Sequence, residues 1–139
     1  MKNAMVSLIV FVVLAGFSMN ASAQRGYSEF DRREGIYIQE YWQRANVFDR
    51  YSNAALSLRM TNETENTVEV VFTVTFYRND QMMFESKDNK ICLRPGQSLR
   101  GANAGLRFMA EGISMDMVRE DWFSWDITHM EVTPVESCK

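Results

Sequence analysis

The side chains that could perform catalysis in this chain are few, and they begin with a single histidine. His129 is the only histidine among 139 residues, so a Ser-His-Asp or Cys-His arrangement would have to use it. Asp126 precedes it by three residues, which places the two side chains on opposite faces of a strand unless a bulge intervenes. The chain contains no Gly-x-Ser-x-Gly, His-Glu-x-x-His or P-loop motif. We therefore expect no catalytic histidine.

Acidic residues late in the chain offer a second kind of chemistry. Two facing carboxylates could hydrolyse a glycosidic bond, and several together could bind Ca²⁺. The residues concerned are Glu111, Asp116, Glu120, Asp121 and Asp126. They lack the Asp-x-Asp-x-Asp-Gly spacing of a calcium loop, and acidic residues in loops are generally solvated. We expect no catalytic residue, metal or cofactor. A small carboxylate-dependent hydrolase and a calcium site in this group are the alternatives.

Cys92 and Cys138 are the only cysteines, and their chemistry depends on the compartment. In an oxidising compartment an even number of cysteines indicates pairing, and two cysteines allow one intramolecular disulfide. That bond would close a loop of 47 residues and add about 4 kcal/mol of stability on the chain-entropy model. Two free thiols, or a dimer bridged through Cys138, are the alternatives. Two cysteines and one histidine at this spacing do not match zinc-ligand patterns.

The first 23 residues have the features of a secretory signal peptide. A short positive start is followed by the almost unbroken apolar run from Val6 to Phe17 and by the small-x-small cleavage site Ala21-Ser22-Ala23. The run is too short for a membrane span, which needs about 20 apolar residues. We predict a secreted or periplasmic protein that is cleaved after Ala23 and begins at Gln24. No membrane span is expected.

The charge of the mature chain limits its partners. Removing the leader from 139 residues leaves 116, which is the length of one domain. Loss of Lys2 leaves 14 of the 15 Lys and Arg residues against 18 Asp and Glu residues, a net charge of −4. Nucleic-acid binding needs a basic face, and binding to anionic lipid needs basic clusters. We therefore expect neither a nucleic acid nor a membrane surface as a partner.

Period-two patterns predict strands through most of the mature chain. Residues 24–34 are polar and charge-dense, and we expect a flexible arm there. Residues 36–42 are rich in aromatic and β-branched side chains, and residues 54–61 and 68–77 alternate, so all three are predicted strands. In the last of these, Phe72 lies on an apolar face and Thr73 on the opposite face. If that opposite face is solvated, Thr73→Ala is nearly neutral.

Turn residues divide the strands and define their register. Asn79-Asp80 predicts a two-residue type I′ hairpin, and Pro95-Gly96 predicts a type II turn. Residues 101–120 are interrupted by three glycines, and 113–118 fits either a strand or one helical turn. In the final strand, 123–132, the apolar phase changes between Ile127 and Met130. This change predicts a bulge near Thr128-His129.

Short strands, many turns and no convincing helix predict an all-β sandwich. Three segments carry a family resemblance: 56–62 (Leu-Ser-Leu-Arg-Met-Thr-Asn), 70–80 (Val-Val-Phe-Thr-Val-Thr-Phe-Tyr-Arg-Asn-Asp) and 93–98 (Leu-Arg-Pro-Gly-Gln-Ser). They resemble bacterial extracytoplasmic immunoglobulin-like domains of the FxLYD-like type, over less than half of the chain. Asn79-Asp80 departs from the glycine turn usual in that family. The resemblance implies an immunoglobulin-like sandwich of about seven to eight strands, here spanning 35–139, with a non-catalytic accessory or binding role.

Aromatic residues are the best candidates for contact with a ligand. Tyrosine and tryptophan supply large, partly polar surfaces that stack on sugars or anchor a protein partner. Most large side chains in a small sandwich are needed for its core. Tyr37, Tyr41 and Trp122 have polar sequence neighbours, so we predict that these three form the binding surface.

These observations favour a non-catalytic binding or accessory module that recognises a protein or a glycan. A structural or assembly subunit that pairs through a strand edge is an alternative. The small hydrolase is the third. Asn62-Glu63-Thr64 is also a formal N-glycosylation sequon, relevant only in a eukaryotic secretory pathway.

Overall fold

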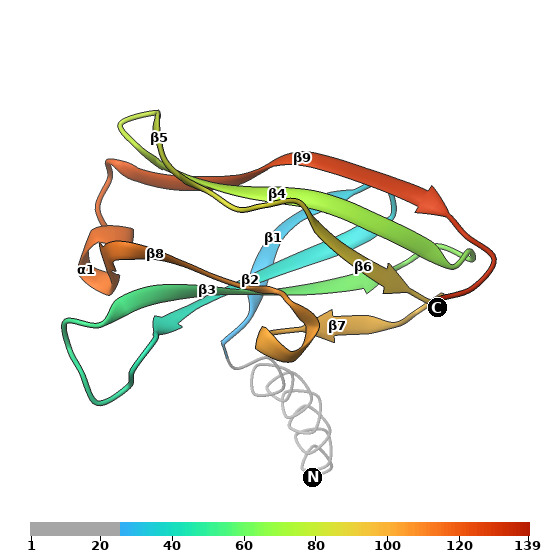
Figure 1. The fold of residues 1–139 in the computed structure, drawn as a ribbon, viewed down its shortest axis with the longest axis horizontal. Helices are drawn as coiled ribbons and strands as arrows, with labels where there is room; N and C mark the ends of the chain where they lie inside the picture. Colours follow the sequence, from blue (N-terminus) through green and yellow to red (C-terminus); the bar gives the residue numbers. More distant parts are fainter. Residues whose placement is uncertain (1–25) are drawn as a thin grey trace, which may run out of the picture.

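The protein folds into two antiparallel β-sheets that pack face to face (Figure 1). This computed structural model describes residues 26–139, so the predicted signal peptide and its cleavage site lie outside the described residues. Sheet A contains β1 (Ser28–Arg33), β2 (Ile36–Arg44), β3 (Asn53–Asn62), β7 (Ser98–Arg100) and β8 (Arg107–Ser114). Sheet B contains β4 (Val68–Arg78), β5 (Gln81–Glu85), β6 (Asn89–Leu93) and β9 (Phe123–Pro134). Two short helical turns, η1 (Ala102–Ala104) and α1 (Met115–Val118), lie between strands.

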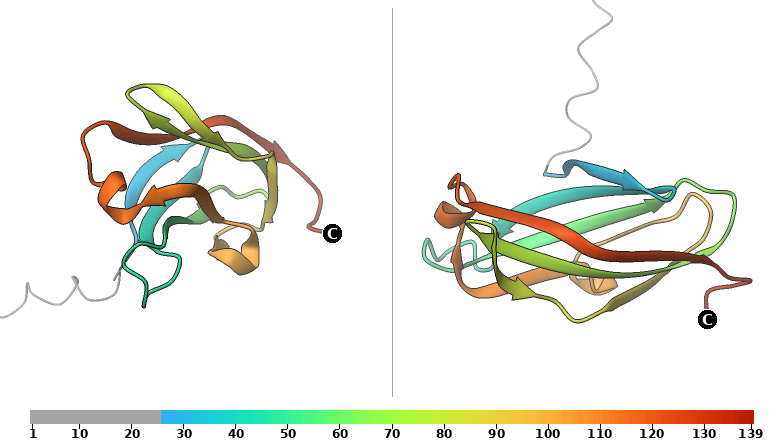
Figure 2. Two further views of the ribbon diagram at one scale, coloured as in Figure 1. Left: turned by 60° about the vertical axis from the view of Figure 1, so that its left-hand side comes forward. Right: turned by 90° about the horizontal axis from the view of Figure 1, so that it is seen from above.

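The chain passes between the two sheets three times. It returns from β6 in sheet B to β7 in sheet A, and it crosses from sheet A to sheet B between β3 and β4 and again between β8 and β9. Since β8 pairs with β3 and β9 pairs with β4, the two crossings from sheet A to sheet B interlock (Figure 2). The predicted all-β sandwich is therefore confirmed, with nine strands in residues 26–139 where about seven to eight were expected. Within this range, neither helical turn is long and apolar enough to cross a membrane.

Alternation along β3 and β4 builds the core between the sheets. Every second residue of each strand points inward, and these side chains are at most 2% exposed. They are Ala54, Leu56, Leu58 and Met60 from β3, and Val68, Val70, Phe72, Val74 and Phe76 from β4. Each large apolar side chain buried in this way contributes about 1.5–3 kcal/mol. A shift of one residue would expose the whole set, so the period of two also specifies the register.

The second face of β4 is not solvated at its centre. Thr73 is only 7% exposed, and Thr75 is buried with it. Thr73 Oγ1 donates to Asp88 Oδ1 at 2.8 Å, and the hydroxyls of Thr75 and Thr128 lie 2.8 Å apart. Because β4 has neighbours on both sides, β5 and β6 on one and β9 on the other, these side chains are covered and hydrogen-bonded.

The predicted flexible arm at 24–34 is wrong for most of its length, because Ser28–Arg33 form the edge strand β1. The sandwich therefore begins before residue 35. A two-residue turn at Glu34-Gly35, with both φ angles positive (50° and 80°), joins β1 to β2. Glycine is favoured at the second position, because other residues rarely adopt its φ of 80° and an added Cβ would clash with Thr64 Cγ2. The segment appeared irregular in the sequence because an edge strand needs few apolar residues, and Phe30 is its one large apolar side chain.

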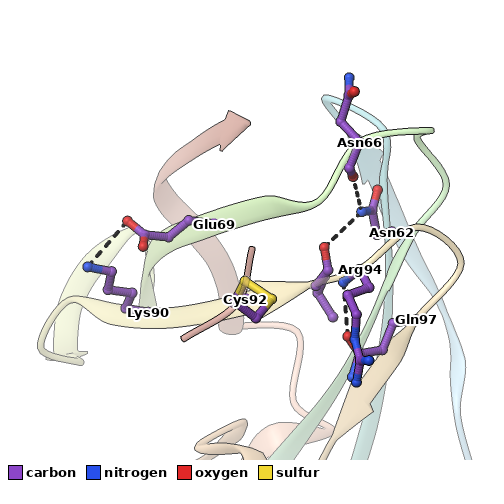
Figure 3. Close-up of a disulfide and its surroundings, with 9 residues drawn as sticks. Asn62, Asn66, Glu69, Lys90, Cys92, Arg94 and Gln97 are labelled. Carbon is purple, nitrogen blue, oxygen red and sulfur yellow. Dashed lines mark hydrogen bonds and ion pairs between the residues drawn. A yellow bond between two sulfur atoms is a disulfide. The ribbon is translucent and has the colours of Figure 1, made fainter. Parts of the chain in front are cut away.

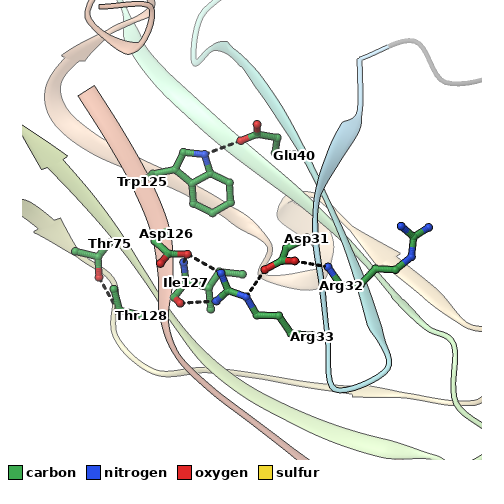
Figure 4. A network of polar contacts seen from close by, with 9 residues as sticks. All are labelled: Asp31, Arg32, Arg33, Glu40, Thr75, Trp125, Asp126, Ile127 and Thr128. Atoms are coloured by element: carbon green, nitrogen blue, oxygen red, sulfur yellow. Dashed lines mark hydrogen bonds and ion pairs between the residues drawn. The ribbon is translucent and has the colours of Figure 1, made fainter. Parts of the chain in front are cut away.

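Arg33 ties the edge strand of sheet A to sheet B (Figure 4). Its Nη1 donates to the Ile127 carbonyl at 2.7 Å, and its Nη2 donates to Asp126 Oδ1 at 2.8 Å. Its Nε donates to Asp31 Oδ2 at 2.7 Å. The bonds from Arg33 and from the Arg32 backbone lower the pKa of Asp31. One guanidinium thus bridges β1 and β9 along the open side of the sandwich.

The predicted bulge in the last strand is confirmed. Val74 lies opposite Ile127 and Thr73 lies opposite His129, so Thr128 is the extra residue of β9. The bulge restores the inward phase, because Phe72 next faces Met130 and Val70 faces Val132. The hairpin at Asn79-Asp80 also forms as predicted, with φ angles of 47° and 66°.

Cys92 on β6 and Cys138 in the tail form the predicted disulfide, with their Cα atoms 5.6 Å apart (Figure 3). Immunoglobulin domains of antibodies instead join their two sheets through a disulfide. Here the bond ties the tail after β9 to a strand of the same sheet. It lies at the end of the sandwich where the chain terminates.

Asn62 closes the same end of the sandwich. Its side chain is fully buried and donates to the carbonyls of Asn66 and Leu93 (Figure 3). Its Oδ1 accepts from the Thr64 backbone and hydroxyl. The adjacent type II turn has Gly96 at φ 74°, as predicted, with Gln97 N bonded to Arg94 O at 3.0 Å. The sequon asparagine is therefore a structural residue in the folded chain.

Candidate functional site

The outer face of sheet A carries a row of tyrosines and glutamines on β2. Tyr37, Gln39, Tyr41 and Gln43 alternate with the inward Ile36 and Ile38, so they share the face away from the core. Both predicted tyrosines are half-buried. The Arg32 guanidinium lies over the Tyr37 ring at 3.9 Å, and the ring centroids of Tyr41 and Tyr27 are 5.6 Å apart. These neighbours hold the rings in place on the sheet.

Beside the tyrosines lies a group of three arginines on the same face, which we call the arginine cluster: Arg59, Arg100 and Arg107. Arg59 on β3 is directly opposite Arg100 on β7. Arg107 on β8 is directly opposite Ser57, two residues before Arg59. On the other side of β3, Gln39 faces Arg59 and Tyr41 faces Ser57. The register thus joins the tyrosine row and the cluster into one surface.

An excursion of the chain produces a shallow open hollow within this surface. Both β7 and β8 pair with the same edge of β3, and between them the chain leaves the sheet through η1. Positive φ angles at Gly101 (70°) and Gly105 (72°) allow this departure and return. The hollow is lined by Tyr27, Tyr41, Ser57, Arg100, Asn103 and Arg107, among others. It offers two guanidinium groups and the amides of Gln43 and Asn103 beside aromatic rings, whereas Ser57 is only 4% exposed.

The cluster has no anionic partner within residues 26–139. None of its three members forms an ion pair there, although Arg32 pairs with Glu29 and Glu63 on the same sheet. The Nε atoms of Arg59 and Arg107 are covered and lack a hydrogen-bond partner among the described residues. Buried donors without acceptors are uncommon and each costs about 1–3 kcal/mol.

Trp122 does not join the two tyrosines, although the three were predicted to form one surface. It precedes β9 in sheet B, where its backbone carbonyl accepts from Asn79 N at 2.8 Å. The guanidinium of Arg78 lies 4.7 Å from the centre of its ring. Tyr37 and Tyr41 lie on β2 of sheet A, so only these two belong to the surface beside the arginine cluster.

His129 and Asp126 contact other residues in the structure, and no hydrogen bond between the two is formed. The bulge does bring them to the same face, since they lie opposite Thr73 and Thr75 respectively. Asp126 nevertheless accepts from Arg33, and exposed His129 lies 3.6 Å from Glu131. Both side chains are thus engaged with other groups.

The late carboxylates are spread over β8, α1 and the segment before β9. Glu111, Asp116, Glu120 and Asp121 are exposed, and Asp126 is bound to Arg33. Within residues 26–139 no group of three or more His, Cys, Asp or Glu side chains is placed to hold a metal ion.

Two further surface features lie outside this site. The β2–β3 loop exposes Val47, Phe48 (96%) and Tyr51 (85%). Asn46 and Asp49 order that loop by accepting from the Phe48 and Tyr51 backbones. A larger hollow lies under the C-terminal tail near the disulfide, and includes the Glu69–Lys90 ion pair.

The arginine cluster is the part of the site that sequence reasoning missed. Arg59 was visible on the outward phase of a predicted strand. Arg100 and Arg107 flank the glycine-rich segment whose structure the sequence left open. The three arginines lie together because residues 98–100 and 107–114 both pair with β3, and this pairing could not be read from the sequence.

Comparisons with protein-family models, with curated proteins and with solved structures found no match. The resemblance of residues 54–100 to extracytoplasmic immunoglobulin-like domains therefore stays a prediction. The functional argument rests on the geometry of this chain.

Proposed function

We propose that the mature protein is a non-catalytic binding module, secreted or periplasmic, that recognises a glycan or a protein on the outer face of sheet A. The observation that carries the proposal is that Tyr37 and Tyr41 lie on the same sheet face as the arginine cluster, with Gln39, only 3% exposed, between the two tyrosines on β2. Aromatic rings provide contact area at small entropic cost, and amides and guanidiniums provide directional hydrogen bonds. A disulfide is also compatible with an oxidising compartment.

The geometry of this surface suits ligand binding better than catalysis. Its hollow is shallow and open, and neither a histidine nor a carboxylate is among the residues that line it. A nucleophile or general base needs a partner within hydrogen-bond reach. Ser57 is only 4% exposed, so the guanidinium and amide groups of the lining are the ones that suit recognition of a polar ligand.

The test is capture of a ligand from envelope or culture-medium extract by the mature chain. A Tyr37→Ala/Tyr41→Ala double variant should lose the captured ligand and keep its melting temperature within a few degrees, because both rings lie outside the core. Trp122→Ala is the matched aromatic control and should bind normally. Normal binding by the double variant, or loss of binding in Trp122→Ala alone, would place the ligand elsewhere.

A separate measurement, the intact mass of the exported protein, tests the localisation. Intact mass of the exported protein should correspond to a chain that begins at Gln24. A mass that retains Met1 to Ala23 would contradict both the export and the oxidising compartment.

A further inference from the structure

Arg59 and Arg100 create a local excess of positive charge in a chain whose net charge is negative. They are direct cross-strand neighbours, an arrangement that is destabilising for like charges, and Arg107 lies on the adjacent pair of the same face. A glutamate or aspartate within reach would reduce the repulsion by pairing with one of these arginines, in the way that Glu29 and Glu63 pair with Arg32. No such residue pairs with the cluster in residues 26–139.

Burial distinguishes two members of the cluster, Arg59 and Arg107, from the other unpaired arginines, whereas Arg100 is exposed. Arg44, Arg50, Arg94 and Arg119 are exposed to solvent. Arg59 and Arg107 are half-buried, and their Nε donors are shielded from water without a protein acceptor. A ligand cannot reach these covered Nε atoms, so an anion would bind through the Nη atoms of the guanidinium groups, where charge-assisted bonds to carboxylate or sulfate are short and directional.

The surroundings of the cluster indicate what carries the anion. The hollow is open and lined by tyrosine rings, Ser57, Gln43 and Asn103, which match the flat faces and hydroxyl groups of sugars. The edge of β3 is covered by β7 and β8, so an extended peptide cannot add to the sheet here. These features favour a polysaccharide over a peptide.

We propose that the ligand of this surface is an acidic polysaccharide, whose carboxylate or sulfate groups bind the arginine cluster while its sugar rings lie along Tyr41 and Tyr27. The inference rests on the proposed function and names the ligand class for the same site. Carboxylate, which is planar, and sulfate, which is tetrahedral, both present negatively charged oxygen atoms to the arginines. The experiment below distinguishes the two groups.

The test is binding of the mature, oxidised chain to four polymers: polygalacturonate, dextran sulfate, neutral dextran and poly-glutamate. We expect binding to polygalacturonate, dextran sulfate or both, weakening as salt rises, and no binding to neutral dextran. The stronger of the two acidic polysaccharides identifies the anion. Poly-glutamate, which has carboxylates without sugar rings, should bind at least tenfold more weakly.

The Arg100→Gln/Arg107→Gln variant should lose at least tenfold in affinity for the preferred polysaccharide. Arg94→Gln/Arg119→Gln removes the same charge from positions outside the cluster and is the matched control, with affinity within about twofold. The melting temperature of the first variant should not fall, because the substitution removes the repulsion between Arg59 and Arg100. Equal losses in both variants would reduce the effect to net charge and overturn the proposal.

Two other results also overturn the proposal and leave the proposed function standing. One is binding of neutral dextran with the affinity of the acidic polymers, and the other is binding of poly-glutamate as tight as that of the polysaccharides. A third result overturns the polysaccharide proposal in the same way: the chain binds none of the polymers but captures a protein from extract, and this capture requires Tyr37 and Tyr41. If neither polymer nor extract yields a ligand that depends on this face, the proposed function fails as well.

Discussion

Trp125 on β9 donates a hydrogen bond from its indole Nε1 to Glu40 Oε2 on β2, over 2.6 Å, and so joins the two sheets (Figure 4). Glu40 occupies an inward position of its strand, after Ile36 and Ile38. Burial therefore raises the pKa of Glu40, and hydrogen bonds from Trp125 and Trp42 offset only part of that effect. The carboxylate is retained as a bridge at a cost in stability when it is ionised.

Glu40→Gln should stabilise the protein at neutral pH. A raised pKa in the folded state means that folding becomes less favourable as pH rises from the ordinary glutamate value of 4.5 through the folded value. The amide oxygen of glutamine still accepts from Trp125 but never ionises. Urea denaturation at pH 4 and at pH 7 should show the gain of the variant growing with pH. A gain that is equal at both pH values, or a loss at pH 7, would show that ionised Glu40 is not penalised.

Arg33→Ala should destabilise the fold by about 1–3 kcal/mol, because three hydrogen bonds to β1 and β9 are lost together. Arg33→Lys should recover little, since an ammonium cannot reproduce the fork. Arg32→Ala is the control. Its pairs with Glu29 and Glu63 are exposed, so its removal should cost under about 1 kcal/mol. Equal effects of the two alanine variants in urea denaturation would contradict a bridging role for Arg33.

Cys92→Ser and Cys138→Ser should lower the free energy of unfolding by similar amounts, up to about 4 kcal/mol for a loop with a sequence separation of 46. The double variant should be no less stable than either single variant, because one bond is lost in all three. Peptide mapping without reductant should show one linked pair in the native protein. A loss confined to one single variant would mean that the thiols act separately.

Phe72→Ala should cost about 3–5 kcal/mol, as expected for a large side chain at the centre of the core. Thr73→Ala, one residue further on, should cost about 1 kcal/mol, because it removes the hydrogen bond to Asp88 from a covered position. Thr73→Ser keeps the hydroxyl and serves as the control. If Thr73→Ala matches wild type in thermal and urea denaturation, the hydrogen bond contributes nothing.

The alternating strands could be predicted because their signal is local. The inward set of β4 from Val68 to Phe76 follows from the period of two alone. The bulge at Thr128 also followed from a change of phase within one strand, and the two turns followed from residues that tolerate positive φ.

The features that could not be predicted depend on pairing between distant segments. The edge strand β1 has a polar sequence and forms because its backbone pairs with β2. The cover over Thr73 comes from Asp88, and the arginine cluster comes from three strands. Sequence periodicity reports which side chains share a strand face, but it carries no information about which strand lies next to it.

The charge of β1 has a consequence for how the protein behaves at high concentration. The outer edge of this strand leaves backbone donors and acceptors open to another chain, as any sheet edge does. Glu29, Asp31, Arg32 and Arg33 crowd that edge, and a register shift between Glu29 and Asp31 distorts it. A second molecule could extend the sheet only by desolvating these charges beside its own. We therefore expect the charged residues of β1 to disfavour edge-to-edge pairing at this side of sheet A.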